Sequence, residues 1–234
     1  MITTLVSWWR NDATRELAAR AWHLLGKTDV ARVLWVVGDS TDGTEPALRA
    51  IAATDARVTV LRRDGGVRAE PESPEARLAR WSRTVDQALD DMAETGGDDD
   101  RVLIHESDLI SPLDIARVLH GVRCEAVAGW PVLTLDTGQV FYDTWATRAH
   151  GTRFSNARPY HAVYRPDRRF AVDSAGSCWS VPAWAIRAGA RCGGLGAVGL
   201  CGALRTLGVR IWVDPMVHVE QPRDLWAPMV GAAA

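Results

Sequence analysis

The chain has 234 residues, of which 47% are hydrophobic and 24% are charged, and its formal net charge is −2. These values are ordinary for a globular domain and speak against a chain too short or too polar to bury one sizeable core. No Cys-x-x-Cys pair occurs among the four cysteines, so neither a zinc site nor a disulfide framework is expected at Cys124, Cys178, Cys192 and Cys201.

Strand and helix patterns alternate along the first half of the chain. Strands are expected at 2–7, 33–37 and 57–63, and a helix at 14–25 with Asp12 near its N-terminus. A second helix is expected at 76–92, because apolar residues recur there every three or four positions, at Leu78, Trp81, Val85, Leu89 and Met92. A further strand follows, with the sequence "RVLIH". This alternation predicts an α/β fold with a mostly parallel sheet covered on both faces.

The second half of the chain is less regular. A strand is expected at 124–135, followed by a segment dense in aromatic residues and arginines. Residues 174–189 indicate a strand or turn entering a short helix, with Pro182 near its first turn. Residues 203–222 then predict a helix, a stop at Gly208, a strand and a loop that carries His218.

Nothing in the sequence suggests a leader or a membrane-spanning segment. The N-terminus has no basic stretch before a long apolar one, and the uncharged run 192–204 is too short and too rich in glycine to cross a bilayer. We therefore expect a cytoplasmic protein without a membrane span, and no protein partner is evident.

Polar clusters follow three of the expected strands, with the sequences "SWWRND", "GDSTDGT" and "HESDL". Ligands of open parallel sheets bind beyond the carboxyl ends of the strands, so the clusters together predict a binding site. In an extended chain Glu106 and Asp108 point the same way, and two carboxylates facing one point indicate a cation. The alternatives are a solvated strand end or a helix cap for this pair, and an Asx turn shaped by Asp39 and Asp42.

Two of these stretches resemble motifs of the GT-A-fold nucleotide-sugar glycosyltransferases. "VLWVVGDSTDGT" looks like their second strand and turn, and "VLIHESDLISP" resembles their Asp-x-Asp motif. The resemblance implies a single Rossmann-like GT-A domain over 1–234, with a nucleotide-sugar-binding half at 1–112 and an acceptor-binding half at 113–234. It also implies that Asp39 contacts the nucleoside and that Asp108 binds the divalent metal on the donor diphosphate, with Glu106 in the place of the first acid.

Later segments are similar to fungal capsule-type α-mannosyltransferases. "FYDTWATRAHG", "AGSCWSVP" and "VDPMVHVE" carry this resemblance, and His218 stands where a histidine supplies a further metal ligand in many retaining GT-A enzymes. Two departures matter. The fungal enzymes carry a membrane anchor, and the acidic pair expected before the last helix is replaced by "LGAVGLCG". An inverting enzyme needs a carboxylate base in that place, so we expect retention of anomeric configuration.

The resemblance assigns roles to particular residues of a hexosyltransferase-like enzyme that uses Mn²⁺ or Mg²⁺ and a UDP- or GDP-sugar. The expected metal ligands are Glu106, Asp108 and His218. Nucleotide-sugar contacts are expected from Ser7, Trp9, Asp39, Arg80, Arg83 and Ser107. Asp173 and Asp143 are the catalytic candidates, and acceptor contacts are expected from Trp145, Arg148, Arg153 and Trp179.

The acceptor is indicated only by the segment 145–170. It sets six arginines against the single acid Asp167, interleaved with aromatic rings. This pattern suits a sugar-binding lip, a track for a nucleic-acid backbone, or a plain arginine-coated surface. The acceptor is therefore expected to be a glycan or a hydroxymethylated base in DNA, the second resembling the small GT-A-like enzymes with which bacteriophages modify their genomes.

Two other classes of function stay open. A non-catalytic nucleotide-sugar binder would have no need of the expected metal ligands Glu106, Asp108 and His218. A nucleotidyltransferase shares the fold pattern and the acids, but a glycine-rich phosphate loop would follow its first strand, and "SWWRND" has no glycine.

Overall fold

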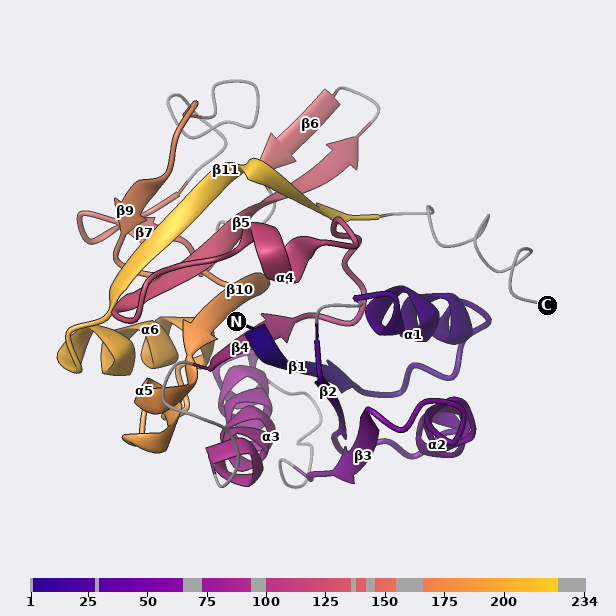
Figure 1. Cartoon of the computed structure of the whole chain (residues 1–234). Coiled ribbons are helices and arrows are strands. Elements are labelled where there is room, and N and C mark those ends of the chain that lie inside the picture. Colours follow the sequence, from indigo (N-terminus) through magenta and orange to yellow (C-terminus); the bar gives the residue numbers. More distant parts are fainter. Residues whose placement is uncertain are drawn as a thin grey trace.

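The structure, a computed structural model, describes residues 2–27, 30–64, 73–93, 100–135, 138–141, 146–154 and 166–222. These residues form a mixed sheet of nine strands that runs through the molecule (Figure 1). Its order is β3-β2-β1-β4-β10-β5-β11-β9, and β6 pairs with β5. The strands are β1 (Ile2–Trp9), β2 (Arg32–Val37), β3 (Val58–Arg62), β4 (Arg101–His105), β5 (Glu125–Leu135), β6 (Gly138–Phe141), β9 (Phe170–Val172), β10 (Cys178–Pro182) and β11 (Arg210–Gln221). A separate hairpin joins β7 (Arg148–Ala149) to β8 (Thr152–Arg153).

Strands β3, β2, β1 and β4 are all parallel, so their carboxyl ends meet at one edge of the sheet. Strand β10 runs antiparallel between β4 and β5, and β5 is parallel to β11. The prediction of an α/β fold around a mostly parallel sheet is therefore confirmed.

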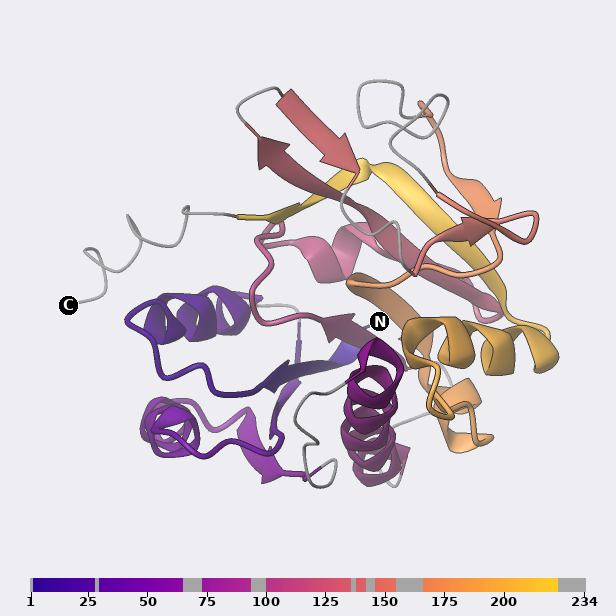
Figure 2. The same ribbon diagram turned by 180° about the vertical axis from the view of Figure 1, so that it is seen from behind.

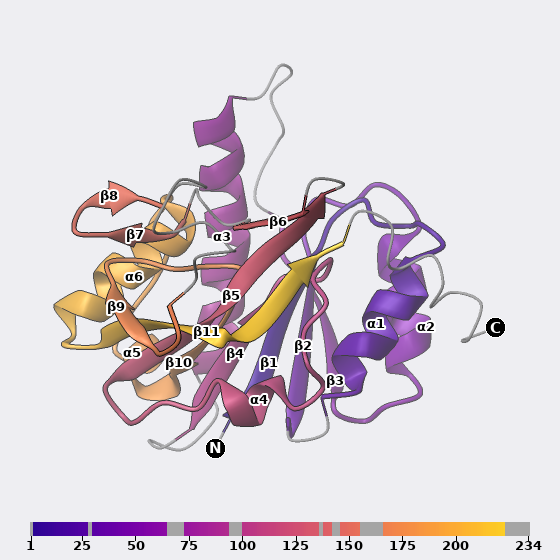
Figure 3. The same ribbon diagram turned by 90° about the horizontal axis from the view of Figure 1, so that it is seen from above.

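Helices cover both faces of the sheet, as Figure 3 shows. They are α1 (Leu17–Leu25), α2 (Thr44–Ala52), α3 (Pro74–Ala93), α4 (Ile115–Val118), α5 (Ala183–Arg187) and α6 (Gly196–Thr206). Adjacent strand residues point to opposite faces, so Leu5 packs in the apolar cluster with α1 and α2, whereas Val6 packs in the cluster with α3, α5 and α6. Each face thus has its own core.

Helix α3 stands beside α6 and α5 on one face (Figure 2). The predicted apolar stripe points inward, with Val85, Leu89 and Met92 fully buried. Nearer the N-terminus of the helix, Leu78 and Trp81 are half-buried. The N-terminal turns of α3 therefore reach past the core toward the carboxyl edge of the parallel strands.

Two local predictions were wrong, and one helix was missed. Helix α1 begins at Leu17 rather than at residue 14, and Asp12 does not cap it, because the Asp12 carboxylate accepts hydrogen bonds from the Arg10 amide and the Arg20 guanidinium. Helix α2 was not predicted at all. His218 lies within β11 rather than in a loop, since the strand continues across a register shift between Asp214 and His218.

Among the helices of the described ranges, none is both long enough and apolar enough to cross a membrane.

Candidate functional site

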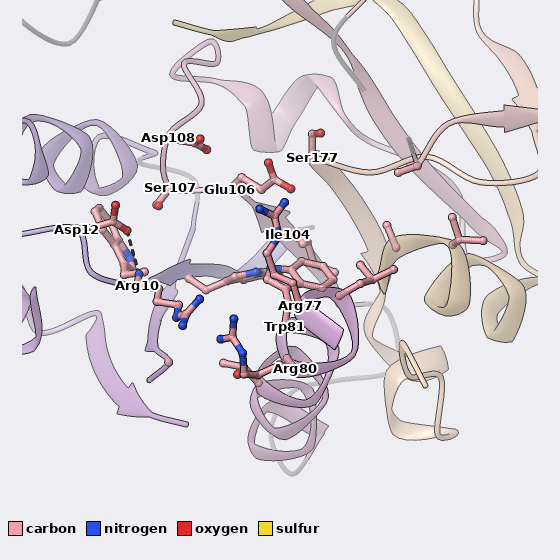
Figure 4. Close-up of a pocket in the computed structure, with 18 of the residues that line it drawn as sticks. Arg10, Asp12, Arg77, Arg80, Trp81, Ile104, Glu106, Ser107, Asp108 and Ser177 are labelled. Carbon is pink, nitrogen blue, oxygen red and sulfur yellow. Dashed lines mark hydrogen bonds between the residues drawn. The ribbon is translucent and has the colours of Figure 1, made fainter. Parts of the chain in front are cut away.

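A pocket of about 540 Å³ opens beyond the carboxyl ends of β1 and β4. Its walls come from the loop after β1, the turn after β4, the first turns of α3, and residues at β10 and the start of α6. Figure 4 shows Glu106, Ser107 and Asp108 along one side, with Arg10, Arg77 and Arg80 reaching in from the facing elements. The volume is that of a small-molecule site, at the edge where such sheets bind ligands.

The acidic turn directly after β4 is held by its neighbours. The Glu106 amide donates to the Ser177 carbonyl at 3.0 Å, and Gln221 Nε2 donates to Asp108 Oδ2 at 3.0 Å. Ser177 has a φ of 65°, an uncommon conformation for a residue with a side chain, and it lines the pocket beside the turn. Both carboxylates are half-buried, so they face the pocket without being removed from solvent.

The fit of a divalent metal depends on these two carboxylates. In the described part of the chain, no group of three or more His, Cys, Asp or Glu side chains is placed to hold a metal ion. The structure therefore does not gather Glu106, Asp108 and His218 into a three-ligand site. Mg²⁺ in nucleotide enzymes is bound by one or two carboxylates together with substrate phosphates and water, and Glu106 with Asp108 fits that pattern.

His218 lies in β11 opposite Trp130 of β5, half-buried. Paired residues of neighbouring strands point to the same face, and Trp130 belongs to the apolar cluster on the α3 face. His218 is thus directed to the face on which the pocket lies, and its role as a metal ligand stays a prediction.

Two tryptophans from different elements meet in the pocket wall. The rings of Trp8, at the end of β1, and Trp81, in α3, have centroids 5.1 Å apart and are tilted by 48°. The next residue, Trp9, is 1% exposed and packs against Trp35, with the Arg20 guanidinium 5.3 Å from its ring centroid. Trp8 therefore offers a ring surface to a ligand, and Trp9 mainly supports the floor.

The loops after β1 and β2 are tied together by side chains. The Asp12 amide donates to Thr44 Oγ1 at 2.7 Å, and the Ala13 amide donates to Asp42 Oδ2 at 3.1 Å. Desolvation acts to raise the pKa of Asp42, but hydrogen bonds from the Thr44 hydroxyl and amide and from the Ala13 amide outweigh it and lower that pKa. The interpretation of Asp42 as a residue that holds this turn is confirmed.

Asp39 forms a largely buried ion pair with an arginine of the pocket. Arg80 Nη1 lies 2.9 Å from Asp39 Oδ2, and the two side chains are 4% and 14% exposed. The Asp39 backbone has a φ of 50°, which asparagine and aspartate tolerate better than most residues, and its amide donates to Asp64. Asp39 thus fixes Arg80 in the pocket wall, whereas its predicted contact with the nucleoside stays a prediction.

The structure brings only some of the predicted site residues to the pocket. Those that line it are Trp9, Arg80, Glu106, Ser107, Asp108 and Trp179. Within the described ranges, the predicted residues away from its lining are Ser7, Asp39, Arg83, Arg148, Arg153, Asp173 and His218. Asp143 and Trp145 lie outside the described residues.

The β7–β8 hairpin, rather than the pocket lining, holds Arg148 and Arg153 and is contacted by Asp173. Arg148 of β7 and Arg153 of β8 are opposite each other in the strand register. Asp173 Oδ2 accepts a hydrogen bond of 2.6 Å from the Gly151 amide in the turn of that hairpin. Arg205 Nη1 lies 3.7 Å from the other Asp173 oxygen. Asp173 therefore anchors the hairpin, which gives it a structural role besides the predicted catalytic one.

The lining residues that sequence reasoning missed include Arg10, Arg77, Trp81 and Ser177. Arg77 was detectable, because it precedes Arg80 and Trp81 by three and four positions and so shares their helix face. Trp81 had been assigned to the core alone. The backbone conformation of Ser177 leaves no trace in the sequence.

Comparison with known proteins identifies the fold. No protein-family profile matches the sequence, and no curated protein matches it. Similar solved structures include GalNAc-T7 with UDP, GalNAc and Mn²⁺ (10% identity, TM-score 0.60, covering 95% of this chain and 44% of that one). The mannosyltransferase PcManGT from Pyrobaculum calidifontis with GDP-Man and Mn²⁺ is also similar (14%, 0.58, 97% and 59%). A third is TarS 1–349 from S. aureus (13%, 0.54, 98% and 63%).

The chain spans between two fifths and two thirds of the length of these structures. At such low identity the likeness concerns the fold, and that fold is the GT-A arrangement of an α/β domain with a mostly parallel central sheet.

Proposed function

We propose that the chain is a metal-dependent glycosyltransferase that moves a sugar from a nucleoside diphosphate sugar to an acceptor hydroxyl. The observation that carries the proposal is the position of Glu106 and Asp108. They line a pocket of about 540 Å³ at the carboxyl edge of the parallel strands, in a fold shared with two structures that contain UDP or GDP-Man together with Mn²⁺.

The described residues suit a donor of this kind. A nucleoside diphosphate has a flat base, two charged phosphates and a polar sugar. The pocket offers the ring of Trp8, the guanidinium groups of Arg10, Arg77 and Arg80, and the acidic turn. The arginines add positive charge where a diphosphate would leave, and such preorganised charge stabilises a leaving group.

A bound divalent metal would neutralise the charge that develops on the leaving diphosphate. Glu106 and Asp108 would hold it, and Ser107 lies between them in the pocket wall. Arg80 is kept in place by Asp39, so its guanidinium is already oriented before a ligand binds. His218 and Arg83 are proposed as additional contacts on the sequence resemblance alone.

We propose that the reaction retains the anomeric configuration. The α6 side of the pocket is formed by Leu195, Ala197 and Val198, and the carboxylates among the described lining residues are Asp12, Glu106 and Asp108. Asp12 is engaged by Arg20 and by the Arg10 amide. No described lining residue thus supplies a base on the α6 side, which supports retention. Proton NMR of the product from an α-linked donor tests this, since a β-linked product would refute it.

For the acceptor we propose either a glycan or a hydroxymethylated base in phage DNA. Both rest on the segment 145–170, of which the structure describes only the ends. We further propose that 1–234 acts as one domain, with the donor bound by 1–112 and the acceptor by 113–234, and the continuous sheet from β3 to β9 supports this. To distinguish the two acceptors, the protein is incubated with a labelled nucleotide sugar and either a glycan or hydroxymethylated DNA, and transfer of the label to each is measured.

Release of nucleoside diphosphate tests the proposed activity as a whole. We expect release from one nucleotide sugar in the presence of Mn²⁺, its loss on chelation, and its loss in the variant Asp108→Ala. If diphosphate release and its dependence on metal are the same in that variant, the acidic turn is not the metal site.

A further inference from the structure

Behind the acidic turn, on the α1 face of the sheet, lies a cluster of buried and half-buried polar residues that the proposed reaction does not use. It consists of Lys27, His23, His105 and Ser111. Lys27 is the only lysine of the chain and is 0% exposed. A fully buried lysine is rare unless its charge is paired, and within the described residues no carboxylate lies within ion-pair distance of it.

The lysine instead satisfies its donors on neutral acceptors. Its Nζ lies 3.1 Å from the Ser111 carbonyl, 3.1 Å from the Pro112 carbonyl and 3.0 Å from His23 Nε2. An ammonium has three N–H donors, so all three are used. Burial lowers the pKa of Lys27 to about 8, which leaves the group protonated at neutral pH. The segment that leads out of the acidic turn is thus bonded to the end of α1.

Two histidines extend this link to both ends of the turn. His105 Nδ1 donates to the Glu106 carbonyl at 2.6 Å, and its Nε2 accepts from the Ser111 hydroxyl at 2.8 Å. The Ser111 amide donates to His23 Nε2 at 3.2 Å. Both rings are neutral, because burial lowers the pKa of each to about 3. The residues that carry Glu106 and Asp108 are therefore fixed at their start and at their end.

We propose that Lys27 is a positioning residue that holds the turn 106–112, through Ser111, Pro112 and His23, so that the carboxylates of Glu106 and Asp108 face the pocket. The inference rests on the proposed function in one respect, namely that the carboxylates of Glu106 and Asp108 bind a divalent metal. The ordering of the turn itself does not depend on it. Residues that do not touch a metal can still orient the side chains that bind it. Loss of such a residue commonly weakens metal binding about 10- to 100-fold.

The test compares Lys27→Met with Arg57→Met in the full chain. Methionine keeps the length of the lysine side chain but donates no hydrogen bond. Arg57 is a control for the support of the same end of α1, since it bonds the backbone carbonyls of Leu25, Lys27 and Val30 rather than the acceptors of Lys27 Nζ. Within the described ranges it has no hydrogen bond to 106–112. Mn²⁺ affinity is measured by calorimetry without donor, and amide hydrogen exchange is followed across residues 106–112.

For Lys27→Met we expect an Mn²⁺ dissociation constant about 10- to 100-fold higher than wild type, with faster exchange in the turn. Arg57→Met should lower the melting temperature but change neither the Mn²⁺ dissociation constant nor amide exchange in the turn. Unchanged affinity in Lys27→Met, or an equal loss in both variants, would overturn the proposal. If Lys27→Met does not fold, His23→Leu replaces it, because leucine offers no acceptor to Lys27 or to the Ser111 amide.

Failure of the proposed function gives a different result. If wild type binds no Mn²⁺, the metal site is refuted, and the exchange data alone decide the role of Lys27. Faster exchange in 106–112 for Lys27→Met but not for Arg57→Met would support it, and unchanged exchange would refute it.

Discussion

Asp108 is the side chain whose charge the proposed metal site needs most. Its half-buried carboxylate already accepts a hydrogen bond from Gln221, so Asp108→Asn can keep the shape of the turn while removing the charge. We expect Mn²⁺ affinity and turnover to fall about 100-fold or more, because a neutral amide is a poor ligand for a hard cation. Asp114→Asn is the control, as an exposed acid on the same connection. Equal effects of the two changes would show that the site is elsewhere.

The Asp39–Arg80 pair gives a second expectation. Removing one partner of a buried ion pair leaves the other charge desolvated, so Arg80→Met should lower the free energy of unfolding by about 3 kcal/mol. Arg62→Met breaks exposed ion pairs with Glu45 and Asp64 and should cost about 1 kcal/mol or less. Urea unfolding of both variants measures the difference. A similar cost for both would mean that Asp39 is not held by Arg80 in solution.

At the level of single side chains, the sequence predicted the acids of the site better than its cations. Glu106 and Asp108 were recognisable because two acids at alternate positions follow closely after the apolar run 102–104. Arg10 was hidden among the many arginines of the chain, and Arg77 could be inferred only from the helix face that it shares with Arg80. The bond between Asp173 and Gly151 could not be predicted, since it belongs to a hairpin that local patterns do not reveal.

Helix α3 places several pocket residues, among them Arg77, Arg80 and Trp81, by packing its C-terminal turns against the sheet. Leu89 is 0% exposed in that packing. Leu89→Ala should therefore lower the free energy of unfolding by about 2–5 kcal/mol, through lost burial and the cavity left behind. Asp90→Asn, at the adjacent position on the exposed side of the helix, should change it by less than about 1 kcal/mol. Thermal or urea unfolding distinguishes the two, and a small loss for Leu89→Ala would contradict the packing of α3.

The histidines between α1 and β4 make a pH dependence of stability expected. The pKa values of His23 and His105 are lowered from 6.5 to about 3 in the folded chain, mainly by burial. The unfolded chain then binds more protons below pH 6.5, so their contribution is complete above that pH and is lost as pH falls from 6.5 toward 3. At pH 5 the loss should be about 4 kcal/mol for the two together. Urea unfolding at pH 7 and 5 measures it, and equal stabilities would refute neutral, buried rings.

Helices and strands were predicted where their apolar pattern is strong. The long stripe of α3 and the apolar runs of β2, β4 and β5 all formed near their expected bounds. Helix α2 escaped prediction because only Thr44 and Leu48 are buried in it, which leaves too weak a periodicity. In β11 a loop was expected around His218. The strand instead accommodates Pro215 within a register shift between Asp214 and His218 and continues to Gln221.

The assembly of the sheet needed the three-dimensional structure. Local patterns predicted parallel strands, but they carry no information that β10 pairs with the sequence-distant β4, or that β11 returns beside β5. These pairings bring Ser177, Trp179 and Gln221 to the acidic turn. The acids at the end of β4 were therefore predictable from sequence, whereas the strand pairings that place Ser177 and Gln221 beside them were not.

Binding of donor and metal at one site is best tested by thermal unfolding with UDP-, GDP-, ADP- and dTDP-sugars, each with and without Mn²⁺. A ligand that binds only the folded chain stabilises it by about 2.7 kcal/mol at 100 times its dissociation constant. We expect the melting temperature to rise with one nucleotide, only when Mn²⁺ is present, and not in Asp108→Asn. No rise with any donor, or the same rise in Asp108→Asn, would contradict a metal-dependent donor site at the end of β4.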